Sequence, residues 1–206
     1  MYGTSLTPRA ARRRARSVAH RTPPDRPPSI PLHTLQGARH IEIQLLADKQ
    51  GNVAVLSGRD CSMQRRFQKI VEEGPPRAVA PETLDKMERA AAALARMVGY
   101  THAGTVEYLF LQETQEFFFL ELNPRLQVEH PVTEGITGCN LPALQLIVAS
   151  GIDLTRLPDE DSVARFISTP DMPYRDPFEK VSGHVIATRI TAENASDGRK
   201  LSLIHI

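Results

Sequence analysis

Hydrophobic and polar residues alternate along two neighbouring segments near residue 50, which predicts two β-strands. In "HIEIQLLAD" (residues 40–48), isoleucine and leucine alternate with glutamate and glutamine, and a strand places alternate residues on one face. The segment "VAVLSG" (residues 53–58) follows after Gly51 and Asn52, a dipeptide that favours a turn. The two segments are therefore predicted to pair as a hairpin.

Three later segments carry helical patterns. "PETLDKMERAAAALARMVGY" (residues 81–100) is amphipathic, with Pro81 at its start and Gly99 near its end, which are typical helix boundaries. "LPALQLIVASG" (residues 141–151) predicts a shorter helix. "CSMQRRFQKIVEE" (residues 61–73) predicts another, because its apolar residues have helical spacing: Met63, Phe67, Ile70 and Val71.

The remaining ordered pattern predicts strands. "GTVEYLFL" (residues 104–111) and "EFFFLELN" (residues 116–123) are joined by a short polar turn, and "GHVIATRITAEN" (residues 183–194) alternates again. Residues 151–180 are polar and proline-rich, which predicts a surface loop. Short connections favour antiparallel pairing, so the fold class is α/β or α+β with antiparallel strand pairs.

Charge is spread unevenly over the 206 residues. Residues 1–37 hold seven arginines, one acidic residue and six of the 16 prolines, which leaves 18 basic and 23 acidic side chains elsewhere. We predict that residues 1–37 are disordered or non-native, with a transit peptide or a nucleic-acid arm as the alternatives. The acidic balance of the rest argues against nucleic acid as a partner.

Two further observations concern the compartment. No apolar run approaches the roughly 18 residues that a membrane span needs, so no membrane is predicted as a partner. Cys61 and Cys139 lie far apart, and we interpret them as reduced thiols of an intracellular protein.

The segment "FLELNPRLQVEHPVTE" (residues 119–134) carries polar side chains at every second position: Glu121, Asn123, Arg125, Gln127 and Glu129. If the segment is a strand, these side chains share one face. The preceding "FFFL" run predicts burial on both faces, and a buried polar row needs a partner. That partner is water, a neighbouring charge or a ligand.

A cation is one such ligand. Glu107 lies in the preceding predicted strand, so pairing of the two strands would bring Glu107, Glu121 and Asn123 together. These oxygen ligands suit Mg²⁺ beside nucleotide phosphates, although charges on a solvent-facing sheet explain the spacing equally well. The nearby basic residues either neutralise phosphate or bicarbonate or form a solvated basic surface: Arg59, Arg65, Arg66 and Lys69.

Taken together, several phrases resemble the biotin carboxylase component of biotin-dependent carboxylases, which are ATP-grasp enzymes. They are "ARHIEIQLLAD", "GRDCSMQRRFQKIVEE", "AGTVEYLF", "FLELNPRLQVEHPVTEGITGCNLPALQL" and "GHVIATRITAEN". The last phrase is similar to the large acetyl-CoA carboxylases of eukaryotes. The resemblance implies the C-terminal half of an ATP-grasp fold at 38–150 and the start of the C-terminal subdomain at 181–200. The ending "LSLIHI" (residues 201–206) reads like a translated library-adapter sequence and is interpreted as a non-native tail.

The resemblance also implies site residues. Metal ligands for Mg²⁺ or Mn²⁺ are implied at Glu107, Glu121 and Asn123. Catalytic roles are implied for Arg125, which would support the carboxyphosphate intermediate, and for Glu129, which would deprotonate bicarbonate. ATP or bicarbonate contacts are implied at His40, Gln64, Lys69, Gln127 and Val128, and a biotin contact at Arg189.

The implied cofactors and partners are ATP, a divalent cation, bicarbonate and biotin on a separate carrier domain. The resemblance further implies a homodimer in the full-length enzyme, in the cytoplasm or alternatively a plastid. Phe67 stands where the family has histidine, and the family's glycine-rich phosphate loop and two ATP-binding lysines have no match in residues 1–37, so we expect this chain alone to be inactive. The alternatives are a propionyl-CoA or pyruvate carboxylase and a non-catalytic binding module.

Overall fold

The computed structural model describes residues 37–66, 68–157, 163–171, 173–190, 193–194 and 200–201. Contacts divide the chain into the units 1–34 and 35–206, and every described residue lies in the second unit. The predictions made for Phe67, for residues 1–36 and for the tail from 202 onward therefore lie outside the described residues.

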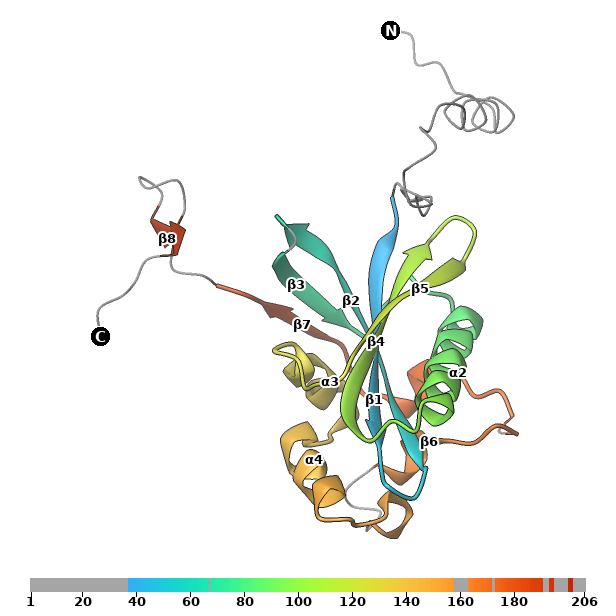
Figure 1. The fold of residues 1–206 in the computed structure, drawn as a ribbon. Helices are drawn as coiled ribbons and strands as arrows, with labels where there is room; N and C mark the ends of the chain where they lie inside the picture. Colours follow the sequence, from blue (N-terminus) through green and yellow to red (C-terminus); the bar gives the residue numbers. More distant parts are fainter. Residues whose placement is uncertain are drawn as a thin grey trace, which may run out of the picture. The chain divides into compact units, whose positions relative to one another are not determined.

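One antiparallel sheet dominates the described part of the chain, and β1 lies near its centre (Figure 1). Along the sheet the strands follow the order β5-β4-β1-β2-β3-β7, and β6 pairs with β2. Their bounds are β1 Arg39–Ala47, β2 Val53–Arg65, β3 Gln68–Gly74, β4 His102–Leu111, β5 Glu116–Asn123, β6 Ile167–Ser168 and β7 Val185–Thr188. A separate pair is formed by β8 Glu193–Asn194 and β9 Lys200–Leu201.

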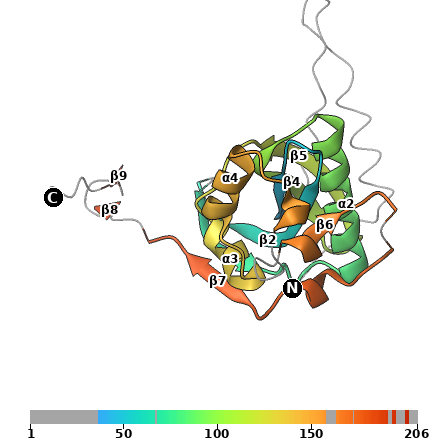
Figure 2. The same ribbon diagram turned by 90° about the horizontal axis from the view of Figure 1, so that it is seen from below.

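Helices cover both faces of the sheet. Figures 1 and 2 show α2 (Pro81–Met97) on one face, and α3 (His130–Thr137) and α4 (Leu141–Ala149) on the other. Each face has its own apolar core, one packed under α2 and one packed under α4. The strands in the middle of the sheet must therefore be apolar on both sides, except where a polar cluster takes the place of the core.

The alternation of β1 explains where that polar cluster lies. Ile41, Ile43 and Leu45 face α2 and are completely buried. The intervening residues face the opposite side, where Leu46 packs into the α4 core but Glu42 and Gln44 are buried as polar groups. One face of β1 thus changes from apolar beside α4 to polar beside α3.

A β-bulge in β2 brings an arginine to the same polar face. Val53 and Val55 point toward α2, but the pairing with β1 shifts register between Ile43 and Leu45, and Ser57 has a φ of 62°. The extra residue reverses the alternation. Arg59 therefore lies directly opposite Glu42, on the polar face, rather than on the face that α2 covers.

The helix predicted for residues 61–73 is wrong. The segment forms the end of β2 and β3 up to its last residue but one, with Arg66 (φ 50°) in the turn between them. Val71 pairs with Met63 on one side and with Thr188 of β7 on the other. The apparent helical spacing rested on only four residues, too few to separate a helix from two short strands.

Other elements differ from prediction in extent. Helix α3 was not predicted, and β7 is shorter than the strand expected at 183–194. The described residues of the segment 151–180, predicted as a surface loop, include β6 and the short helices η1 Leu154–Arg156, η3 Ala164–Phe166 and η4 Pro177–Lys180. Phe166 is 2% exposed in the α4 core, so this segment is partly structural. No helix among the described residues is long and apolar enough to span a membrane.

Strand β5 is less buried than its sequence predicts. Phe118, Phe119 and Leu120 are 45%, 57% and 45% exposed, which contradicts burial on both faces. The reason is topological, because β5 is the last strand of the sheet and has a neighbour on one side only. The predicted pairing of β5 with β4 is confirmed, with Glu107 opposite Glu121.

Candidate functional site

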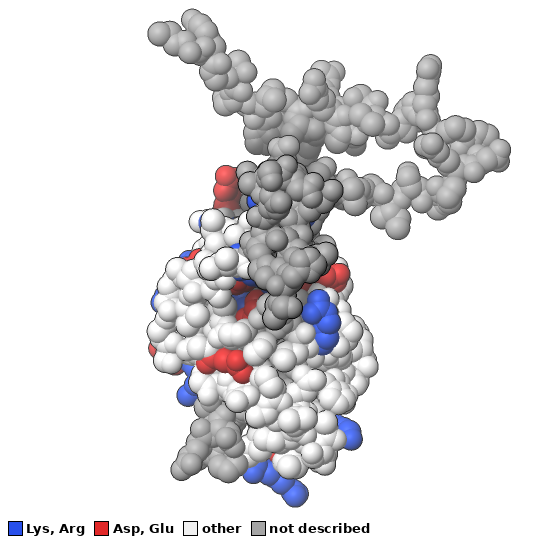
Figure 3. Space-filling model, turned by 90° about the vertical axis from the view of Figure 1, so that its left-hand side faces the viewer, with Lys and Arg blue, Asp and Glu red and all other residues white. Residues whose placement is uncertain are grey.

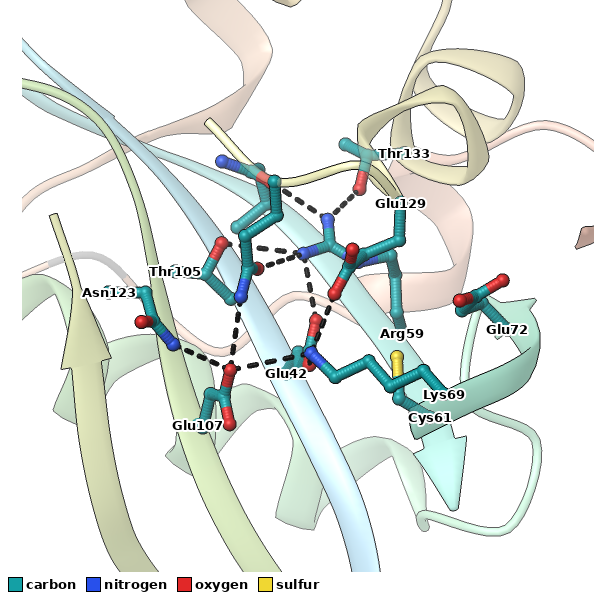
Figure 4. A network of polar contacts seen from close by, with 12 residues as sticks. Glu42, Arg59, Cys61, Lys69, Glu72, Thr105, Glu107, Asn123, Glu129 and Thr133 are labelled. Atoms are coloured by element: carbon teal, nitrogen blue, oxygen red, sulfur yellow. Dashed lines mark hydrogen bonds and ion pairs between the residues drawn. The ribbon is translucent and has the colours of Figure 1, made fainter. Parts of the chain in front are cut away.

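The candidate site lies on the polar face of the sheet, under the start of α3 (Figure 4). Strand register builds it: Glu42 of β1 lies between Arg59 of β2 and Glu107 of β4, and Gln44 lies opposite Thr105. Directly opposed residues share a face of the sheet. Four buried polar groups and one arginine are thus brought together by strand pairing alone.

Lys69 of β3 joins three carboxylates of this cluster. Its Nζ lies 2.6 Å from Oε1 of Glu129 and 3.5 Å from Oε1 of Glu107, and it also contacts Oε1 of Glu42. Burial alone would lower the pKa of Lys69, but Glu42 and Glu129 outweigh burial and raise that pKa above its ordinary value. The lysine therefore acts as a fixed internal cation.

Glu107 is the carboxylate with the most donors around it. His40 Nε2 lies 2.6 Å from its Oε2, while Asn123 Nδ2 and Gln127 Nε2 donate to its Oε1 at 2.7 and 3.1 Å. Burial of Glu107 opposes ionisation, yet His40 and the charge of Lys69 outweigh it and lower its pKa to about 2. Gln64 continues this series of hydrogen bonds, because its Nε2 lies 2.8 Å from Nδ1 of His40.

Glu129 precedes the first residue of α3 and is held by two cations. Its Oε1 accepts from Lys69, and its Oε2 accepts from Nη2 of Arg189 at 2.7 Å. Arg189 also donates through Nε to Glu72 at 2.7 Å. Burial would raise the pKa of Glu129, but the hydrogen bond and charge of Lys69 hold it below the ordinary value. Glu129 is therefore ionised at neutral pH and can accept a proton.

The three predicted metal ligands lie together. Nδ2 of Asn123 donates both to Glu107 at 2.7 Å and to Glu121 at 3.1 Å, so the two carboxylates point toward the same amide. Rotation of that amide would turn its oxygen toward the carboxylates. Two carboxylates and one amide oxygen are hard ligands of the kind that Mg²⁺ and Mn²⁺ take beside phosphate oxygens. The donor set therefore fits the predicted cation.

Two further clusters have metal-like spacing but suit a cation less well. The ligand atoms of His40, Glu42 and Glu107 lie within 4.8 Å of one another, as do those of Glu42, Cys61 and Glu129. Lys69 pairs with each of these glutamates, so an ammonium group already supplies the cation there. Burial also raises the pKa of the Cys61 thiol, which disfavours the thiolate that binds metals.

The strand predicted for the polar row ends earlier than expected. Strand β5 stops at Asn123, and the chain then runs irregularly into α3. As a result Gln127 is buried in the cluster, whereas Val128 is 72% exposed. Arg125 is exposed, and its Nη1 donates to the backbone oxygen of Leu126 at 3.3 Å. The period of two therefore does not continue through this row.

Sequence reasoning missed part of the cluster. It proposed Arg59 as a group that neutralises phosphate or bicarbonate, but Arg59 is completely buried and bonded to protein groups. It also omitted three acceptors around that arginine, namely Glu42, Thr105 and Thr133, and it omitted Glu72, which accepts from Arg189. The available signal was "IEIQL", where polar residues alternate with isoleucine in a strand that is buried on both faces.

The charged groups on the surface are scattered. On the face drawn in Figure 3, uncharged atoms cover most of the described surface, and blue and red atoms occur in small separate groups. A continuous basic stripe of the kind that binds nucleic acid is not present on that part of the described surface.

Residues 32–157 match the family "Carbamoyl-phosphate synthase L chain, ATP binding domain". Among curated proteins, acetyl-CoA carboxylase of Dictyostelium discoideum is 51% identical over 82% of this chain. Acetyl-CoA carboxylase 1 of Arabidopsis thaliana is 46% identical over 84% of this chain. The chain spans only 8% of the length of each of these relatives.

Solved structures agree with these matches. A biotin carboxylase from Campylobacter jejuni, in a βγ-ATP complex, is 36% identical with a TM-score of 0.64, covering 79% of this chain and 32% of that one. The bicarbonate-bound biotin carboxylase domain of a thermophilic 2-oxoglutarate carboxylase is 38% identical with a TM-score of 0.65, covering 81% of this chain and 33% of that one. The biotin carboxylase type of ATP-grasp fold predicted from the sequence is confirmed.

Proposed function

The chain belongs to the family of the carbamoyl-phosphate synthase L chain ATP-binding domain, and on that premise we propose that it is part of the biotin carboxylase component of an acetyl-CoA carboxylase. The proposed reaction consumes ATP and bicarbonate to carboxylate biotin on a separate carrier domain, and it leads to malonyl-CoA for fatty-acid synthesis. Identity of 46 to 51% with acetyl-CoA carboxylases supports this assignment over a propionyl-CoA or pyruvate carboxylase. The biotin carboxylase subunit of a pyruvate carboxylase is 36% identical.

The observation that carries the proposal is the convergence of Glu107, Glu121 and Asn123 beside an ionised Glu129. The first three residues would hold Mg²⁺ or Mn²⁺, which offsets phosphate charge when it is bound. Glu129 would take the proton from bicarbonate, because Lys69 keeps its carboxylate charged while Arg189 holds its other oxygen. A bicarbonate oxygen would then attack the γ-phosphorus of ATP, with ADP as the leaving group.

The exposed residues next to the cluster would bind the anions. Arg125 has no carboxylate partner among the described residues, so its guanidinium is available to carboxyphosphate. Val128 and Gln127 would line the bicarbonate and biotin pocket, and Arg189 would contact biotin. The residues on β1, β2 and β3 assigned to ATP or bicarbonate contact are His40, Gln64 and Lys69.

Some partners remain predictions. Binding of a biotin carrier domain, homodimer formation and a cytoplasmic location, with a plastid as the alternative, are implied by the resemblance. They are part of the proposal because the chain spans one third of a solved biotin carboxylase and 8% of a curated relative.

A first experiment measures cation binding by the full chain. Calorimetric titration with Mn²⁺ is expected to show one site that Glu121→Gln weakens by at least tenfold. Glu116→Gln is the matched control, because Glu116 lies at the other end of β5, where Thr114 bonds it. Equal affinities in the two variants would refute the metal assignment.

A second experiment measures chemistry. Residues 39–190 replace the corresponding segment of the Campylobacter jejuni biotin carboxylase, and ATP cleavage is followed with bicarbonate and free biotin. The chimera is expected to turn over, and Arg125→Ala is expected to lower kcat by about 10² or more. A folded chimera that cleaves no ATP, or an Arg125→Ala variant with full activity, would overturn the proposal.

A further inference from the structure

Arg59 is a completely enclosed charge of the site, as is its partner Glu42. The Arg59 side chain is 0% exposed, and five acceptors lie within hydrogen-bond distance of its two terminal nitrogens, so two of the three acceptors at Nη2 share one N–H. The acceptors are Gln44 Oε1 at 2.8 Å, Thr133 Oγ1 at 2.7 Å, Glu42 Oε2 at 3.0 Å, Thr105 Oγ1 at 3.4 Å and Gln127 Oε1 at 3.2 Å. These acceptors belong to β1, β4, α3 and the segment before α3, so one side chain ties four parts of the chain together (Figure 4).

Stability alone does not account for this arginine. A buried ion pair is commonly no more stable than apolar side chains of similar volume, because both charges lose their water. Arg59 also leaves its Nε buried without a hydrogen-bond partner in the described part of the chain, which adds a further cost. A group that is expensive to bury and still incompletely bonded requires another explanation.

Gln127 supplies that explanation. An arginine has only donors, so the amide of Gln127 must turn its oxygen toward Arg59 and its nitrogen away. The nitrogen then faces Oε1 of Glu107, an ionised carboxylate that only accepts. Arg59 thereby fixes both the position of Gln127 and the direction of its amide dipole.

The same contact fixes the segment that carries the proposed catalytic groups. Gln127 lies between Arg125 and Glu129 in sequence, and the segment from 124 to 129 has no strand partner of its own. Arg59 bonds this segment through Gln127 and bonds α3 through Thr133. The segment and the helix are therefore anchored to the sheet at a common point.

We propose that Arg59 is a positioning residue, which touches no substrate but sets the amide orientation of Gln127 and the conformation of residues 124–129. The assignment rests on the proposed function only for the catalytic importance of Arg125 and Glu129. Its physical content is the coupling of Arg59 to Gln127, which can be measured without nucleotide, metal or turnover.

The test compares Arg59→Met with Leu84→Ala in the full chain. Leu84 is a completely buried residue of α2 on the opposite face of the sheet, so Leu84→Ala destabilises the fold without touching the cluster. The readouts are the side-chain amide resonances of Gln127 in a ¹H–¹⁵N spectrum and amide hydrogen exchange of residues 124–132. Thermal unfolding measures how much stability each variant loses, so that the spectra are compared at a known loss of stability.

We expect Arg59→Met to shift the Gln127 amide resonances toward those of a solvated glutamine and to speed exchange at 124–132 by about tenfold or more. Leu84→Ala is expected to leave those resonances in place at the same loss of stability. Unchanged Gln127 resonances in Arg59→Met, or equal changes in both variants, would show that Arg59 is structural only.

Arg59→Lys keeps the test valid if Arg59→Met does not fold. A lysine ammonium has three donors on one nitrogen, so it cannot satisfy acceptors in four parts of the chain. A folded Arg59→Lys protein with intermediate Gln127 shifts supports the proposal, and one with wild-type shifts overturns it. If these spectra behave as expected while the chimera is inactive, the proposed function fails and the positioning of Gln127 by Arg59 stands.

Discussion

Two glutamates on opposite faces of the sheet have similarly small exposed fractions, but their pKa values shift in opposite directions. Glu107 on β4 is 3% exposed, and its pKa falls to about 2. Glu88 on α2 is 4% exposed, and its pKa rises to about 7. Burial disfavours the charged carboxylate in both cases, so the sign depends also on a second factor that offsets burial.

That factor is the supply of donors. Glu107 receives hydrogen bonds from His40, Asn123 and Gln127 and lies near Lys69. Glu88 has Lys180 at 3.2 Å from Oε2, while its Oε1 is buried without a hydrogen-bond partner in the described part of the chain.

Asp85, about one turn earlier on the same helix, and Arg89, the next residue, act on the pKa of Glu88 in opposite directions. A buried carboxyl group is thus a charged ligand only where the fold surrounds it with donors, as the candidate site does.

The largest expected effect comes from removing the central cation of the site. Lys69→Met leaves Glu42, Glu107 and Glu129 without their shared partner, and breaking a buried pair costs about 3 to 5 kcal/mol. The loss should shrink at pH 5, because protonation removes unpaired negative charge. Urea unfolding at pH 7 and pH 5 measures it.

Lys180→Met is the matched control, since Lys180 pairs with a single carboxylate that protonates readily. Its cost should be less than half that of Lys69→Met, and equal costs would contradict the comparison.

The next effect is that of Glu107→Gln. The folded-state pKa of Glu107 lies below the ordinary 4.5, so its stabilisation is present above pH 4.5 and is lost as pH falls toward 2. A shift of this size corresponds to about 3 kcal/mol at pH 7. The advantage of wild type over Glu107→Gln in free energy of unfolding should therefore shrink by about 3 kcal/mol as pH falls from 7 to below 2. A difference that stays constant with pH would refute the ionised state of Glu107.

Glu88→Gln should act in the opposite direction. The folded-state pKa of Glu88 lies above its ordinary value, so its contribution is present below pH 4.5 and is lost as pH rises through 7. Relative to Glu88→Gln, the wild type should lose about 2.5 kcal/mol between pH 5 and pH 8. Chemical unfolding across that range measures the difference. A wild type that gains stability over Glu88→Gln with rising pH would contradict it.

The sequence predicted the long helices and the β4–β5 strand pair best. Helices 81–100 and 141–151 and the β4–β5 pair were predicted because long amphipathic runs and alternating runs are strong local signals. Pairing of these two strands was enough to bring Glu107, Glu121 and Asn123 together.

What the sequence could not predict depends on single residues and on distant partners. The bulge at Ser57 reverses which face Arg59 occupies. The pattern of apolar and polar residues in this strand does not predict the bulge. The hairpin at 61–73 was mistaken for a helix, since its strands gain their stability from β2 and β7 rather than from local propensity. Arg189 reaches Glu129 across 60 residues of sequence, a contact that only the folded sheet defines.

The smallest expected effect on stability belongs to a residue that the proposed chemistry needs most. Arg125 is exposed and bonds its own neighbour, so Arg125→Ala should change the free energy of unfolding by less than about 0.5 kcal/mol. Arg156→Ala is the control, because Arg156 is also exposed, at the end of η1, and lies 3.9 Å from Asp153. Thermal unfolding of the chain should not distinguish the two variants, whereas ATP cleavage by the chimera should fall only for Arg125→Ala. A large stability loss in Arg125→Ala would place this arginine among the buried charges that hold the site together, and its exposure to substrate would no longer explain its position.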